Sequence, residues 1–129
     1  MSYAAATSAY KNMEVLSASP GRLVVIVFDF LLVNLRRTAI GIETRNAQLS
    51  SDSITKAQDA IVELLGELDM ERGGEISKQL KSLYSFFLTE LIDVRRSSDV
   101  TRLSRITAQV GELRDAFAQI ADTATASAA

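Results

Sequence analysis

Carboxylates spaced one helical turn apart are the first candidates for chemistry in this sequence. Glu63 and Glu67 form one such pair, and Glu71 and Glu75 form a second, which two glycines interrupt. Carboxylates at this spacing can hold a divalent metal ion or share a proton. Charged residues on a helix are far more often solvated, so the pattern favours an exposed helix face. We therefore predict no metal site and no cofactor.

The residue types that are missing exclude most enzyme chemistry. The chain has 129 residues and contains neither histidine nor cysteine. A Ser-His-Asp triad, a Glu-x-x-His metal site, thiolate chemistry and disulfides are thus excluded. The net charge of −2 offers no general attraction to nucleic acid. We predict a binding protein rather than an enzyme, without a nucleic-acid partner.

A few charged residues remain as candidates for polar contacts. Asp29 lies inside an apolar run, where we expect it to cap a backbone group, pair with an arginine or bond the backbone of a bound chain. Arg114 and Asp115 have the pattern of an ordinary exposed pair. Arginines also gather near the last predicted turn, namely Arg95, Arg96, Arg102 and Arg105. They could meet acidic groups or phosphate, although a solvated loop is the simpler interpretation.

The segment that contains Asp29 is the most apolar part of the chain. From Leu23 to Leu35 its only polar residues are Asp29 and Asn34. A bilayer needs about 20 apolar residues, so this run is too short to cross a membrane. Its β-branched residues would suit a strand, but the rest of the chain is helical in pattern. We predict a helix that begins at Ser19 and Pro20 and ends near Arg45. No signal peptide is apparent at the N-terminus, so we expect a cytoplasmic protein without membrane insertion.

Three further segments carry apolar residues at steps of three and four, which is one face of a helix. They are Ser53–Asp69, Glu75–Arg95 and Val100–Ile120. The polar stretch Asn46–Asp52 separates the first helix from the second. Gly73 and Gly74 separate the second from the third, and Ser97 to Asp99 separate the third from the fourth. Four helices of this length predict an all-α fold, an antiparallel four-helix bundle with a short N-terminal capping segment. We divide the chain into a cap at residues 1–18, the bundle at 19–121 and a disordered tail at 122–129.

Two of these helices carry more apolar residues than one core face requires. In the first, such residues surround the helix: Val24, Val25, Val27, Phe28, Phe30 and Val33. In the helix predicted for Glu75–Arg95, Phe86, Leu88 and Ile92 extend the apolar stripe to a second side. Both helices could lie deep in a compact bundle or meet in a homodimer. Alternatively they line a groove for a partner's helix, which the N-terminal segment, with bulky Tyr10 and Met13, would cover in the free protein.

Ordered sequence blocks resemble those of the flagellin-specific secretion chaperones of the FliS family. The blocks are AYKN, V-x-x-AS-P-G-R-L-V-x-I-V-F-D, KAQDAIVELLGELD, G-E-I-x-x-x-L-x-x-LYSFF and ELRDAF, which together span Tyr10 to about Ile120. The resemblance implies a cytoplasmic chaperone of flagellar type III export. Its partners would be the disordered C-terminal segment of flagellin, which it keeps from polymerising early, and the export gate protein FlhA. A self-associating helical adaptor or structural bundle, a homodimer, stays open as the alternative.

The resemblance also implies roles for particular residues. Tyr10, with Met13, corresponds to the cap and to export-gate recognition. The implied flagellin-binding residues are Ile26, Phe28, Asp29, Lys56, Ile61, Leu64, Leu68, Tyr84 and Leu88. This sequence departs from the family pattern at Phe28, where tyrosine is common, at Phe30, where glycine is usual, and at Arg95, where asparagine is frequent.

Overall fold

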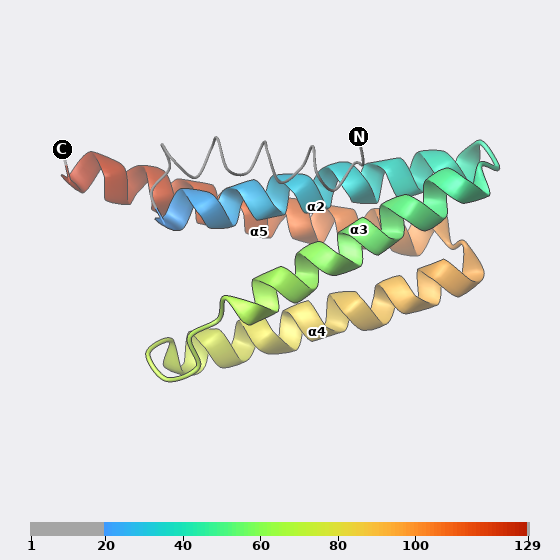
Figure 1. Ribbon diagram of the computed structural model, residues 1–129. Coiled ribbons are helices and arrows are strands. Elements are labelled where there is room, and N and C mark those ends of the chain that lie inside the picture. Colours follow the sequence, from blue (N-terminus) through green and yellow to red (C-terminus); the bar gives the residue numbers. More distant parts are fainter. Residues whose placement is uncertain (1–19, 129) are drawn as a thin grey trace.

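The computed structural model describes the backbone of residues 20–128 and the side chains of residues 21–123. This part of the chain forms the four helices α2 (Pro20–Glu43), α3 (Ala47–Gly66), α4 (Gly74–Ser97) and α5 (Val100–Ala128). Successive helices run in opposite directions (Figure 1). The predicted all-α, antiparallel four-helix bundle is confirmed. The predicted cap at residues 1–18, including Tyr10 and Met13, and the predicted N-cap Ser19 lie outside the described residues.

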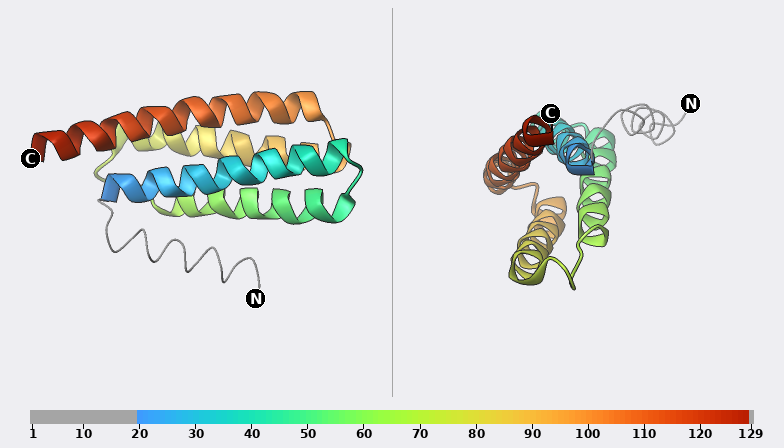
Figure 2. Two further views of the ribbon diagram at one scale, coloured as in Figure 1. Left: turned by 90° about the horizontal axis from the view of Figure 1, so that it is seen from above. Right: turned by 90° about the vertical axis from the view of Figure 1, so that its left-hand side faces the viewer.

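The helices are arranged as a four-membered ring around the core. Helix α2 packs against α3 and α5, and α4 packs against the same two helices from the opposite side. The end-on view in Figure 2 shows α2 and α4 at opposite corners of this arrangement. Figure 1 shows α3 and α4 leaving the α2–α5 layer toward the end of the bundle where they are joined. The packing is therefore closer at the other end.

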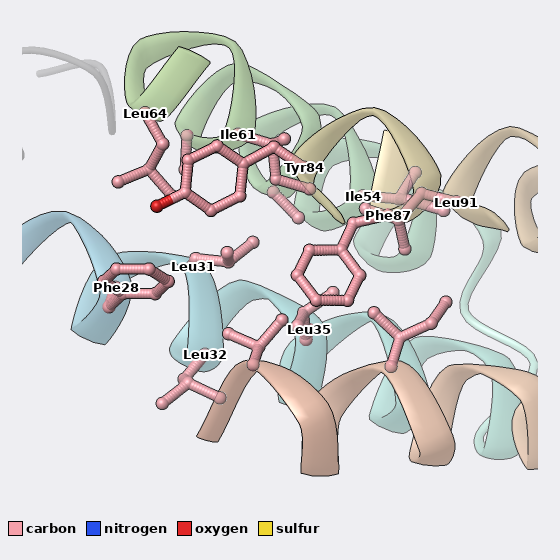
Figure 3. Packing of buried hydrophobic residues seen from close by; sticks show 14 of the residues in the cluster. Phe28, Leu31, Leu32, Leu35, Ile54, Ile61, Leu64, Tyr84, Phe87 and Leu91 are labelled. Atoms are coloured by element: carbon pink, nitrogen blue, oxygen red, sulfur yellow. The ribbon is translucent and has the colours of Figure 1, made fainter. Parts of the chain in front are cut away.

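The predicted apolar stripes supply the core. Tyr84 and Phe87 of α4 project toward Leu31 and Leu35 of α2 (Figure 3). The largest fully buried side chains come from all four helices: Tyr84, Phe28, Phe87, Leu31, Leu35, Ile61, Leu91, Leu103, Ile106, Val25, Val94 and Val110. Burying one side chain of this size contributes about 1.5–3 kcal/mol. Stability thus follows from the three- and four-residue periodicity of the sequence.

The two polar residues of the first apolar run both have partners. Asn34 is fully buried, and its Nδ2 donates to the carbonyl oxygen of Phe30 in the preceding turn. Asp29 accepts a hydrogen bond from Arg114 of α5, with 2.8 Å between Oδ1 and Nε. The expectation that Asp29 pairs with an arginine is confirmed.

The turn between α2 and α3 is shorter than predicted. The polar stretch Asn46–Asp52 was expected to be a loop, but α3 begins at Ala47. Asn46 is its N-cap, because the Asn46 side chain accepts a hydrogen bond from the backbone N–H of Leu49 at 3.0 Å. Gly41 makes this tight connection possible. A Cβ atom at position 41 would lie 2.5 Å from the backbone nitrogen of Ser50, so α2 and α3 approach closely there.

Glycines and short side chains form the other two turns, as the sequence predicted. Gly74 has a φ of +53°, which favours glycine. The carboxylate of Asp69 accepts from the backbone N–H groups of Glu71 and Arg72 in the same turn. Between α4 and α5, Asp99 accepts from the backbone N–H of Arg102 and so caps α5.

The end of α5 differs from the expectation. The division into residues 1–18, 19–121 and 122–129 stays a prediction, but α5 continues to Ala128, where a disordered tail was expected. The segment after Ile120 is rich in alanine and contains neither glycine nor proline. Alanine has the highest helix propensity, so nothing in the sequence ends the helix earlier.

Candidate functional site

The carboxylate pairs do not form a metal site in the described part of the chain. Glu63, Glu67, Glu71 and Glu75 are all exposed. Among the described residues no group of three or more histidine, cysteine, aspartate or glutamate side chains could hold a metal ion. No helix in this part of the chain is long and apolar enough to cross a membrane. The features that remain as candidates are apolar side chains on the surface.

The most exposed large hydrophobic side chains lie on α4 and α5. Ile76 is 69% exposed and Ile120 is 65% exposed. The two helices are antiparallel, and ion pairs from Arg102 of α5 to Glu90 and Asp93 of α4 set their register. Each residue of a helix adds about 1.5 Å along its axis. Measured from these ion pairs, Ile76 and Ile120 lie at roughly the same height along the bundle axis. Both therefore lie at the end of the bundle where α3 and α4 are joined.

Each isoleucine ends a row of apolar residues on its helix. On α4 the row is Ile76, Leu80 and Leu83, and on α5 it is Leu113, Phe117 and Ile120. The inner members of both rows are partly buried and pack against the core. We call these six residues the α4–α5 surface. It presents apolar area beyond what the bundle covers, as a groove for a partner's helix would.

Phe28 of α2 contacts both α4 and α5 from inside the bundle. Its ring stacks on Phe117 of α5, with 5.3 Å between ring centroids, and meets Tyr84 of α4 edge-on at 6.3 Å. Phe28 and Tyr84 are buried. Burial, together with the negative charge of Glu67, raises the pKa of the Tyr84 hydroxyl to about 12. Phe117 of the α4–α5 surface is thus part of an aromatic cluster whose other members are buried.

A smaller apolar strip lies between α3 and α4. Ile92 is 62% exposed and Val62 is 56% exposed. Leu65 and Leu88 are partly buried and pack against the core. Hydrogen bonds from Arg95 of α4 to α3 set the register of these helices. We call Val62, Leu65, Leu88 and Ile92 the α3–α4 surface.

Comparison with known proteins identifies the family of this chain. The model of the family described as "Flagellar protein FliS" matches residues 2–124. This chain belongs to the FliS family. The flagellar secretion chaperone FliS of Escherichia coli is 30% identical over 116 residues, which cover 86% of this chain and 85% of that protein. The FliS chaperone of Bacillus subtilis is 27% identical over 112 residues, covering 87% of this chain and 83% of that protein.

A third relative, the FliS chaperone of Salmonella typhimurium, is 28% identical over 112 residues, covering 86% of this chain and 83% of that protein. The FliS relatives are named for a chaperone, which is a binding protein and not an enzyme. The predicted family, and the prediction of a non-enzymatic protein, are confirmed.

The structure divides the residues that the FliS resemblance implied into three groups. Buried in the bundle are Ile26, Phe28, Ile61, Leu64 and Tyr84. Partly or fully exposed are Asp29, Lys56, Leu68 and Leu88. Tyr10 and Met13 lie outside the described residues. All of the buried group except Ile26 belong to the hydrophobic core cluster, so only the exposed group is directly available to a partner in this conformation.

Asp29 and Lys56, the charged members of the exposed group, both interact with neighbouring charged side chains. Arg114 lies between Asp29 and Asp115, and the hydrogen bond that it donates to Asp29 raises the pKa of its guanidinium. The expectation of a simple exposed Arg114–Asp115 pair was therefore incomplete. Partial burial lowers the pKa of Lys56, partly offset by Asp52.

The exposure of Ile76 and Ile120 could not be predicted from the sequence, because both fit the apolar stripes of their helices. The helical pattern assigns each of them correctly to the inner face of its helix. It carries no information on the distance to the neighbouring helix, which grows toward the Gly73–Gly74 turn. The available signal was their position at the outer end of each stripe.

Proposed function

We propose that this FliS-family protein is a cytoplasmic export chaperone that binds the disordered C-terminal segment of flagellin, prevents premature polymerisation and delivers flagellin to the export gate protein FlhA. The observation that carries the proposal is the α4–α5 surface, with Ile76 and Ile120 left uncovered at one end of the bundle. A disordered client segment would fold there as an amphipathic helix, with apolar residues at steps of three and four.

The energetics suit a complex that must later be released. Coupled folding and binding buries roughly 1,000–3,000 Å² and loses about 2–5 kcal/mol to ordering of the client. The α3–α4 surface lies on another side of α4 and would extend the contact when the client wraps around that helix. Tyr10 and Met13 are assigned to the cap and to gate recognition on the family resemblance alone.

Calorimetry with the C-terminal peptide of the cognate flagellin tests the proposal. We expect saturable binding at micromolar concentrations, and its absence would refute the proposed client. Ile76→Asp and Ile120→Asp should each weaken binding about tenfold or more, since burying an isoleucine contributes about 1.5–3 kcal/mol. Ile40→Asp is the matched control, because Ile40 is a 51% exposed isoleucine on α2, away from both surfaces.

The same variants distinguish client binding from self-association. Light scattering over a range of concentrations reports whether the free protein is a monomer or a homodimer. If Ile76→Asp weakened self-association and left peptide binding unchanged, the α4–α5 surface would be a dimer interface. Equal effects of Ile76→Asp and Ile40→Asp on peptide binding would also contradict the assignment.

A further inference from the structure

Arg95 differs from Arg96 and Arg102 because it has no acidic partner among the side chains that the structure describes. Arg96 pairs with Asp93 at 2.6 Å between Nη2 and Oδ1, and Arg102 pairs with Glu90 at 3.5 Å between Nε and Oε2. No carboxylate among residues 21–123 lies within ion-pair distance of Arg95. Its positive charge is therefore not neutralised by the side chains that the structure describes.

Neutral groups hold the Arg95 guanidinium in place across the α3–α4 interface. Its nitrogen atoms donate to Thr55 Oγ1, to Gln58 Oε1 at 3.3 Å, and to Ser51 Oγ at 3.5 Å. Neutral acceptors orient a guanidinium without cancelling its charge. The result is a fixed cation with hydrogen-bonding capacity left for a further acceptor, since a guanidinium has five N–H donors.

Two acidic residues close to this region in sequence, Asp52 and Asp99, make hydrogen bonds to other groups. Asp52 accepts two hydrogen bonds from Gln48 Nε2, at 2.9 Å and 3.0 Å. Asp99 caps α5 by accepting from the backbone N–H of Arg102. Both acids are thus held in local hydrogen bonds, and neither lies within ion-pair distance of Arg95.

A pocket of about 270 Å³ opens beside this guanidinium, between the start of α3 and the end of α4. Hydroxyl groups line it, from Thr38, Ser50, Ser51 and Ser98, and its apolar wall includes Ile54 and Val94. The first turn of α3 also borders the pocket, and the positive end of that helix dipole favours an anion. The Thr38 and Ser50 hydroxyls already donate to backbone carbonyl groups, of Asn34 and Ala47. The cation, the hydroxyls of Ser51 and Ser98 and the pocket together form a site complementary to a small oxyanion.

We propose that this Arg95 pocket binds an oxyanion, either free in solution or carried as a carboxylate by a bound polypeptide. The guanidinium would contact two oxygen atoms of the ligand, a geometry that arginine offers to carboxylate and phosphate alike. The free-anion form of the inference is independent of the proposed function. The polypeptide form rests on it, because it places an acidic residue of the flagellin segment at this corner of the bundle.

Nuclear magnetic resonance with inorganic phosphate as the probe tests the site, with ionic strength held constant by sodium chloride. We expect saturable shifts of the backbone amide signals of Ser51 and Ser98, with a Kd in the millimolar range. Arg95→Gln should abolish them, whereas Arg95→Lys should retain a weaker response. Arg96→Gln is the matched control, since Arg96 is the adjacent arginine and is already paired. Absence of saturable shifts in the unaltered protein would overturn the proposal, whatever the variants do.

Competition with the flagellin peptide separates the two sources of the oxyanion. If phosphate weakens peptide binding in the unaltered protein but not in Arg95→Gln, the ligand is a carboxylate of the bound chain. If phosphate binds without affecting the peptide, the ligand is a free anion. If the peptide does not bind at all, the proposed function fails while the phosphate titration still decides the pocket.

Discussion

Gly41 offers a direct test of the close approach between α2 and α3. Gly41 and Gly111 both lie within helices, so replacing either by alanine should gain about 1 kcal/mol of helix propensity. Their surroundings differ. A Cβ atom at position 41 would lie 2.5 Å from the Ser50 nitrogen and 2.8 Å from its Cα atom, whereas one at position 111 would meet nothing within 4 Å. The same substitution should therefore have opposite effects.

The magnitude follows from the backbone that the new methyl group meets. Relief to an ordinary contact distance requires α3 to move by about 1 Å near its N-cap, because backbone atoms cannot rotate away. Overpacking typically costs about 1–3 kcal/mol, and a contact this short with backbone atoms belongs in the upper part of that range, at about 2–3 kcal/mol. After the gain of about 1 kcal/mol in propensity, we expect Gly41→Ala to lose about 1–2 kcal/mol. Gly111→Ala should instead gain up to about 1 kcal/mol.

Urea and thermal unfolding, followed by far-ultraviolet circular dichroism, measure both changes. For a domain of this size, 1 kcal/mol corresponds to a shift in Tm of roughly 3–5 °C. The reasoning would be refuted if Gly41→Ala were as stable as the unaltered protein, or if the two alanine variants shifted Tm in the same direction. A more severe Gly41→Val variant should lower Tm further, since it adds volume at the same contact.

Three further predictions concern pH and the N-terminal segment. The pKa of Tyr84 is about 12 in the folded protein and about 10 in the unfolded chain. The contribution of Tyr84 to the free energy of unfolding should therefore be constant below pH 10 and fall by about 3 kcal/mol as the pH rises to 12. In alkaline unfolding experiments, Tyr84→Phe should remove this loss. A hydrogen bond from Arg96 lowers the pKa of Asp93 in the folded protein. The Asp93 carboxylate therefore stabilises the fold above its unfolded pKa, and this stabilisation is lost on acidification. Below about pH 4, acid should reduce the free energy of unfolding less in Asp93→Asn than in the unaltered protein. Deleting residues 1–16 should leave helicity nearly unchanged and increase binding of an apolar dye, and a collapsed thermal transition would show instead that the segment belongs to the core.

Local sequence signals predicted the fold well where one residue decides the backbone. Pro20, the two glycines at 73 and 74, and Asp99 marked helix boundaries that the structure confirms. The N-cap Asn46 was missed because the polar residues after it resemble a loop. They form the exposed side of the first turns of α3, and the pattern for that helix becomes apolar only from Ile54 onward.

Long-range geometry limited the prediction of the candidate site. Arg114 lies 85 residues from Asp29 in sequence, so its pairing partner could not be read from local spacing. The close approach of Ser50 to Gly41 could not be predicted either, since it depends on how α2 and α3 cross. Likewise, Phe28 and Tyr84 match family motifs, but only the three-dimensional packing shows them below the surface rather than on it.

The position of α4 in the ring has a consequence for how the protein adjusts to what it binds. Its ends are the turn at Gly74 and the left-handed residue Ser98, with φ values of +53° and +56°. Along its length α4 packs on α3 and α5, while α2 keeps its own packing with those two helices. A small outward displacement of α4 would therefore expose more of the α4–α5 surface and of the α3–α4 surface, and leave the α2–α3–α5 layer assembled. Amide protons of α4 should then exchange with solvent sooner than those of α2, and a ligand beside α4 should slow that exchange.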